Sequence, residues 1–131
     1  MSFIGNSYMD RKEYIYFLKN NGIRVECFGA GWNNKPVSEK KMLEIFKKSK
    51  VSLNFSKSRG NEKQIKARVF EIIGAGGLCL SEDAPNLTKF FKPNKQISLF
   101  RNTNQSSIIS ISEDGAAPLN WFLICASRRC L

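Results

Sequence analysis

The stretch that decides the fold is KARVFEIIGAGGLCL, Lys66 to Leu80. Apolar residues here and just before it recur at the i, i+4, i+7 and i+8 positions of a helix: Ile65, Val69, Ile72 and Ile73. A cluster of three glycines, Gly74, Gly76 and Gly77, then interrupts the helical pattern, and a short apolar run follows. The stretch therefore predicts a helix over residues 64–73 that turns directly into a strand over residues 78–80.

The polar residues of this predicted helix have two interpretations. Gln64, Arg68 and Glu71 fall at i, i+4 and i+7, so they form a polar face of their own. Arg68 and Glu71 are compatible with an exposed ion pair, which the spacing alone favours. The alternative is a ligand-binding face, in which the acid accepts hydrogen bonds from a sugar diol and the arginine binds a diphosphate. The glycines are likewise a helix stop or a bare backbone that a ligand approaches closely.

The same alternation of strand and helix extends along the chain to both sides. Further strands are predicted over residues 2–4, 23–28, 51–55 and 97–100, and further helices over residues 10–20, 38–48 and 85–91. This order predicts an α/β fold, a Rossmann-like and mostly parallel sheet with helices on both faces. Ligands of such sheets bind beyond the carboxyl ends of the strands, where the strand order reverses.

Length and composition fit one domain, or one lobe of a larger enzyme. The chain has 131 residues, of which 42% are hydrophobic, and its formal net charge is +10. It contains neither a long apolar run nor a basic leader, which predicts a cytoplasmic protein. Cys27 and Cys79 lie in apolar runs and are predicted to be buried thiols in a reducing compartment.

Much of the positive charge is local. Residues 38–68 carry ten lysines and arginines against three glutamates, a net charge of +7. Such a segment is compatible with a lysine-rich solvated surface, or with contact to nucleic acid, anionic lipid or a phosphate-bearing ligand.

Several catalytic classes are excluded by missing residues. Without histidine the chain cannot build a Ser-His-Asp or Cys-His system, and the usual zinc sites have few candidate ligands. No P-loop motif is present, and the glycines at 74–77 follow a helix and do not open one, so they are not a dinucleotide fingerprint. No metal site is predicted, and the catalytic residues are unknown.

Five segments in unbroken order resemble the C-terminal lobe of group 1 glycosyltransferases, most closely the CgeB-like (spore maturation) subgroup. The first segment runs from Phe3 to Arg11 and begins with FIGN. The others are CFGAGW (Cys27 to Trp32), VSEKKMLEIFKKSKVSLNFS (Val37 to Ser56), KARVFEIIGAGGLCLSE (Lys66 to Glu82) and FFKPNKQISLF (Phe90 to Phe100). The resemblance implies one lobe of a two-lobed GT-B enzyme, the lobe that binds the nucleotide-sugar donor.

The resemblance also implies roles for individual residues. Glu71 matches the glutamate that binds the ribose hydroxyls, and Arg68 a basic position near the donor diphosphate. The remaining matches lie in turns and strand ends around that ligand: Gly76 and Gly77 beside the diphosphate, Gly5, Asn6 and Arg11 against the phosphates or sugar, and Asn54 and Ser56 facing the nucleotide. No cofactor or metal is expected, because positive side chains and a helix dipole take the charge of the leaving diphosphate.

Two departures from the family limit this interpretation. The N-terminal lobe is missing from the sequence, and the likeness stops after residue 103. We therefore divide the chain into a nucleotide-sugar-binding lobe over residues 1–103 and an atypical tail over residues 104–131, interpreted as a truncated or altered ending. Activity of the isolated chain, as a hexosyltransferase-like glycosyltransferase, is left open.

The alternative function is a Rossmann-like, non-enzymatic binding module that uses the basic segment over residues 38–68. Its partner would be nucleic acid or an anionic membrane, of which we favour the membrane, with the protein peripheral at its surface.

Overall fold

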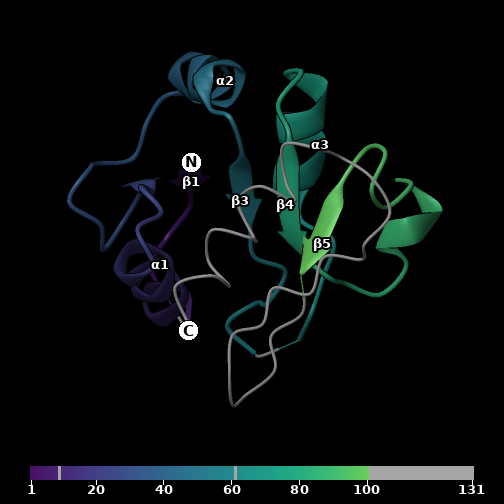
Figure 1. The fold of residues 1–131 in the computed structure, drawn as a ribbon, viewed down its shortest axis with the longest axis horizontal. Coiled ribbons are helices and arrows are strands. Elements are labelled where there is room, and N and C mark those ends of the chain that lie inside the picture. The colour runs from purple at the N-terminus through teal and green to yellow at the C-terminus, as the bar shows by residue number, and fades with distance from the viewer. Residues whose placement is uncertain (9, 61, 101–131) are drawn as a thin grey trace.

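The computed structural model describes residues 1–8, 10–60 and 62–100, which fold into a single sheet with helices packed on it (Figure 1). The predicted tail over residues 104–131 lies outside the described residues. In chain order the elements are β1 (Ser2–Ile4), α1 (Arg11–Asn20), β2 (Glu26–Phe28), α2 (Glu39–Lys48), β3 (Ser52–Asn54), α3 (Ala67–Gly74), β4 (Cys79–Glu82), the 3-10 helix η1 (Leu87–Lys89) and β5 (Ser98–Phe100). Strands and helices alternate as the sequence predicts.

The five strands are all parallel and lie in the order β2-β1-β3-β4-β5. The chain first moves outward from β1 to β2, and then crosses back past β1 to β3. The reversal in strand order therefore falls between β1 and β3, and the loops that follow these two strands lie side by side at the carboxyl edge of the sheet.

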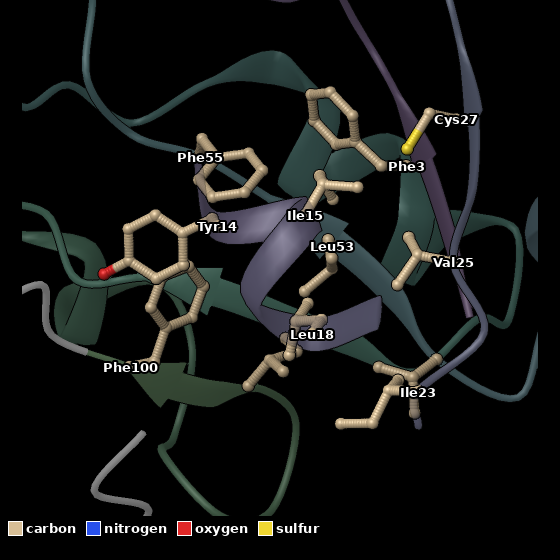
Figure 2. Packing of buried hydrophobic residues seen from close by; sticks show 12 residues of the cluster. Phe3, Tyr14, Ile15, Leu18, Ile23, Val25, Cys27, Leu53, Phe55 and Phe100 are labelled. Atoms are coloured by element: carbon tan, nitrogen blue, oxygen red, sulfur yellow. The ribbon is translucent and has the colours of Figure 1, made fainter. Parts of the chain in front are cut away.

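Each face of the sheet is covered by helices, as predicted. On one face α1 packs Tyr14, Ile15 and Leu18 against apolar side chains from the strands (Figure 2). The rings of Tyr14 and Phe100 lie side by side there, with centroids 5.6 Å apart. On the other face α2, α3 and η1 build a second core from a buried set: Met42, Phe46, Val69, Ile72 and Leu87. The second core fixes α3 against β3 and β4.

The helix of the opening stretch begins later than predicted. It starts at Ala67 instead of residue 64, because Lys66 is extended (φ −92°, ψ 143°) and the amide of Gln64 donates to the carbonyl of Ser56 (3.0 Å). Gln64 is therefore part of the preceding loop, and the polar face of the helix consists of Arg68 and Glu71 without it. Val69 and Ile72 are fully buried, as the stripe predicts.

Other element bounds differ by a few residues. The second strand begins at Glu26 instead of residue 23, and β4 continues to Glu82, beyond the predicted end at residue 80. The helix predicted over residues 85–91 is only the three-residue turn η1, since Asn86 before it adopts a left-handed conformation (φ 65°). No helix within the described ranges is long and apolar enough to cross a membrane.

Both described cysteines are free, buried thiols, as predicted. Burial raises the pKa of Cys27 to about 11 and that of Cys79 to about 12, because the apolar surroundings disfavour a thiolate. Neither side chain is suited to act as a nucleophile.

Candidate functional site

A polar pocket of about 280 Å³ opens at the carboxyl edge of the sheet, where the strand order reverses. The ends of β1 and β3 and the beginnings of α1 and α3 form its walls: Ile4, Gly5, Tyr8, Arg11, Asn54, Phe55, Lys66, Ala67, Arg68 and Glu71. Five of the nine predicted site residues are among them. Two larger hollows lie at the opposite edge of the sheet, around Lys19 to Glu26 and around Met1 and Lys50, and carry none of the predicted residues.

Arg68 and Glu71 form an ion pair on the first turns of α3. Arg68 Nη1 lies 2.7 Å from Glu71 Oε2, and both side chains are partly buried. The guanidinium also contacts the sulfur of Met42 and lies 5.9 Å from the ring centre of Phe46. The ion pair expected from the i, i+3 spacing is therefore present, and the same two side chains line the pocket.

Arg11 is buried in the wall of the pocket, with only 7% of its surface exposed. It donates to the carbonyls of Asn6 (2.9 Å) and Lys57 (3.4 Å) and to the hydroxyl of Tyr8 (3.0 Å). Its guanidinium also stacks on Tyr8, 3.9 Å from the ring centre. Among the described residues no carboxylate pairs with Arg11 within 4.0 Å, and its Nε donates no hydrogen bond.

The electrostatic state of Arg11 follows from this environment. Burial lowers the pKa of the Arg11 guanidinium, because the charged form is poorly solvated there. A buried cation that lacks a paired carboxylate is stabilised by an anion that enters the pocket.

The turn after β1 is held in place by Trp32. Trp32 Nε1 donates to the carbonyl of Gly5 (2.8 Å), so the tryptophan anchors the loop. Gly29 approaches so closely that a Cβ there would lie 2.5 Å from the Gly5 carbonyl oxygen. Gly5 lines the pocket, whereas the exposed side chain of Asn6 accepts from the amide of Ala30 (3.3 Å), and only the Asn6 carbonyl reaches Arg11.

Asn54 and Ser56 lie in different surroundings, because Asn54 ends β3 and Ser56 belongs to the loop that follows. Asn54 lines the pocket and donates from Nδ2 to the hydroxyl of Ser81 (2.8 Å). Ser56 is fully buried below it. Its hydroxyl donates to the carbonyl of Asp83 (3.1 Å) and its amide to Glu82 Oε2 (3.0 Å). Ser56 therefore supports the loop under the pocket and does not line it.

The structure does not bring Gly76 and Gly77 to the pocket. Because α3 leads from β3 back to the start of the parallel strand β4, its C-terminal end lies at the opposite edge of the sheet. Gly76 has a left-handed backbone (φ 78°), typical of a helix stop. A Cβ on Gly77 would lie 3.0 Å from the Phe46 carbonyl oxygen, so this glycine lets α2 and α3 approach.

Three residues of the site were not predicted. Tyr8 and Lys66 line the pocket, and Glu82 is buried outside its lining, where it accepts from the amides of Ser56 and Lys57. Lys66 lies in the first turn of the helix predicted over residues 64–73, and Glu82 lies two residues beyond the strand predicted over residues 78–80. Both are therefore near element ends where parallel sheets carry functional side chains, which was the one positional signal for them.

One comparison with known proteins gives a match over most of the chain. The model of a family described as glycosyl transferase-like matches residues 11–110, a region that contains Arg11, Asn54, Arg68 and Glu71. No curated protein matches the chain.

Proposed function

The chain belongs to the glycosyl transferase-like family, and from this premise we propose that it is the donor-binding lobe of a GT-B glycosyltransferase, related to the CgeB-like subgroup. The nucleotide-sugar donor binds in the pocket at the carboxyl edge of the sheet. The observation that carries the proposal is the chemistry of that pocket. One carboxylate, Glu71, and three cationic side chains, those of Arg11, Lys66 and Arg68, line a single hollow at the reversal in strand order.

The carboxylate suits the sugar end of a nucleotide. Glu71 is 38% exposed at its side chain, so one oxygen can accept from ribose hydroxyls while the other keeps its contact with Arg68. A vicinal diol offers two donors at the separation of the two carboxylate oxygens, which makes an acid the suitable partner.

The cations suit the diphosphate. Arg11 and Arg68 lie on opposite walls of the pocket, on α1 and α3, and Lys66 directly precedes α3. The first residues of α3, Ala67 and Arg68, are in the lining as well, so the positive end of the helix dipole faces the same hollow. A diphosphate would thus gain hydrogen bonds from guanidinium groups and stabilisation from the helix.

These groups give the lobe a defined part in catalysis. When the bond between sugar and diphosphate breaks, negative charge develops on the leaving diphosphate, and the fixed cations stabilise it. In our proposal positive side chains stabilise this negative charge, and no bound metal is required. The acceptor and any base would come from a second lobe, so we propose a transferase whose activity requires that lobe.

The alternative of a non-enzymatic module on a basic surface is not favoured by the family match. It makes a different prediction. Binding to a polyanion through residues 38–68 would weaken steeply between 50 mM and 200 mM salt, and Glu71→Ala would not change it.

Titration calorimetry of the full chain with UDP, GDP and ADP tests the proposal. We expect saturable binding of at least one, weakened by about tenfold or more in Arg68→Ala and in Glu71→Ala. A matched control is the exposed i, i+3 pair on α2, Lys41 and Glu44 (3.3 Å), whose alanine variants should bind as the original chain does. The proposal fails if well-folded protein binds none of the three nucleotides.

A further inference from the structure

Glu82 is a buried carboxylate that does not line the pocket but accepts hydrogen bonds from the loop after β3. It ends β4, only 2% of its surface is exposed, and its partners are mostly backbone groups. Oε2 accepts from the amides of Ser56 (3.0 Å) and Lys57 (3.3 Å). Oε1 accepts no hydrogen bond from the described residues and faces the ammonium of Lys63 at 3.6 Å. A buried charge is tolerated when its partners are fixed, so this arrangement holds the loop after β3 in one position.

That loop folds back on itself and is fastened to Glu82 at both of its ends. The amide of Ser58 donates to the carbonyl of Glu62 (2.8 Å), and that of Gln64 to the carbonyl of Ser56 (3.0 Å). Glu82 therefore binds the outgoing strand of the loop through two amides and the returning strand through Lys63. Removing its charge would release both strands.

The same segment of the loop positions Arg11. The carbonyl of Lys57 accepts from Arg11 Nη2 (3.4 Å), and the ammonium of Lys57 pairs with Asp10, directly before α1 (2.8 Å). Lys57 thus connects Glu82, through its amide, with the start of α1, through its carbonyl and its side chain. A shift of the Lys57 peptide would displace the guanidinium that lines the pocket.

We infer that Glu82 is a positioning residue for the anion-binding arginine of this pocket, acting on Arg11 through the peptide of Lys57. The inference rests on the proposed function, because it takes the diphosphate of the donor as the ligand of Arg11. It does not involve contact between Glu82 and the ligand.

The direction in which Glu82→Gln changes the affinity for a diphosphate distinguishes positioning of Arg11 from a purely electrostatic effect of Glu82. Glu82 lies near enough to Arg11 to interact with its charge. If Coulomb interaction alone acted, Glu82→Gln would remove a negative charge from the neighbourhood and strengthen the binding of a diphosphate. If Glu82 positions Arg11, the same substitution weakens binding, because the guanidinium loses its fixed place.

The experiment is a double-mutant cycle on the full chain. Calorimetry compares the original protein, Glu82→Gln, Arg11→Ala and the double variant, with whichever of UDP, GDP and ADP binds most tightly and with its nucleoside. We expect Glu82→Gln to weaken diphosphate binding by about tenfold, to leave nucleoside binding unchanged, and to have no further weakening effect in the Arg11→Ala background. Glu44→Gln, at an exposed carboxylate on α2, serves as the control and should have no effect.

Other outcomes overturn the inference. Tighter or unchanged diphosphate binding in Glu82→Gln contradicts it. It is also contradicted if Glu82→Gln weakens diphosphate binding equally in the original protein and in Arg11→Ala. If the original chain binds no nucleotide, the proposed function itself fails, which is a different result from an additive cycle.

A second measurement applies if Glu82→Gln does not fold. Hydrogen exchange of the original chain should slow on ligand binding more at the amides of Ser56 and Lys57 than at that of Ser52, at the far end of β3. Equal slowing at all three amides contradicts the inference.

Discussion

Arg68 Nη1 and Glu71 Oε2 lie 2.7 Å apart on α3, so the two groups that we propose bind the donor neutralise each other. A ligand that binds to both must share or replace this contact. A diphosphate can replace Glu71 as the partner of Arg68, and ribose hydroxyl groups can replace Arg68 as the partner of Glu71. A nucleoside has hydroxyl groups but no phosphate, so it can replace only the partner of Glu71. The ion pair therefore favours ligands that carry both chemical groups.

The first prediction tests separately how the diphosphate and the nucleoside of the ligand are bound. In Arg68→Ala the affinity for a nucleoside diphosphate falls by about tenfold or more, while the affinity for the nucleoside does not fall, because Glu71 is then free to accept from the ribose. In Glu71→Ala both affinities fall. Calorimetry with paired ligands, such as uridine and UDP, measures both. Loss of nucleoside binding in Arg68→Ala would show that the arginine does not act on the phosphates.

The second prediction concerns Arg11, a buried cation that pairs with no carboxylate among the described residues, which is unfavourable for stability. Arg11→Met keeps an unbranched apolar stem but removes the buried charge and the guanidinium that stacks on Tyr8. We expect a thermal midpoint that is equal or higher, together with a loss of diphosphate affinity of about tenfold or more. Arg24→Met, at an exposed arginine, is the control and should change neither. A large drop in the midpoint would mean that Arg11 is retained for stability.

The sequence predicts the sheet and much of the pocket for an identifiable physical reason. Val69 and Ile72 mark α3 because a buried helix stripe has a fixed period, and the glycines after them favour a helix end. Gly5, Asn54 and Glu71 could be placed at one edge because parallel strands bring their carboxyl ends together. Their position at this edge follows from local pattern and chain direction, whereas the site roles of Gly5 and Asn54 were implied by the family resemblance.

The rest depends on contacts between distant segments, which local pattern does not contain. Gln64 fits the helical period, yet its amide pairs with Ser56, and the helix begins later. Arg11 has the sequence context of an exposed first-turn residue, but Tyr8 and the Lys57 peptide enclose it. Glu82 acquires its role only when the loop after β3 folds over the end of β4.

The third prediction is a loss of stability at alkaline pH caused by the two buried thiols. The pKa of Cys79 is raised to about 12 in the folded protein, and that of Cys27 to about 11, whereas an exposed thiol titrates near pH 8.5. Above that pH the unfolded chain loses protons that the folded chain retains, so the free energy of unfolding decreases as the pH rises. The decrease is at most about 1.4 kcal/mol per pH unit for each thiol.

Urea denaturation at pH 8 and at pH 10 measures this loss. Cys79→Ala should show a smaller decrease in the free energy of unfolding between the two pH values than the original chain does, although it is less stable at both because a buried side chain has been truncated. Equal decreases in the two proteins would show that Cys79 does not remain protonated through this range.

The fourth prediction tests whether the glycines at the end of α3 serve helix packing or ligand binding. Gly77→Ala places a Cβ 3.0 Å from the Phe46 carbonyl oxygen and 3.1 Å from that of Ile72, both of which are backbone atoms in packed helices. It should therefore lower the free energy of unfolding by about 1–3 kcal/mol. Gly74→Ala is the matched control. No atom of its surroundings lies within 4 Å of the new Cβ, and alanine suits a helical residue better, so stability should rise by about 0.5–1 kcal/mol.

Because Gly77 packs against α2 and lies far from the pocket, nucleotide affinity measured on the folded fraction should be the same in both variants. A selective loss of diphosphate affinity in Gly77→Ala would instead assign this glycine to the ligand, as the family resemblance implies.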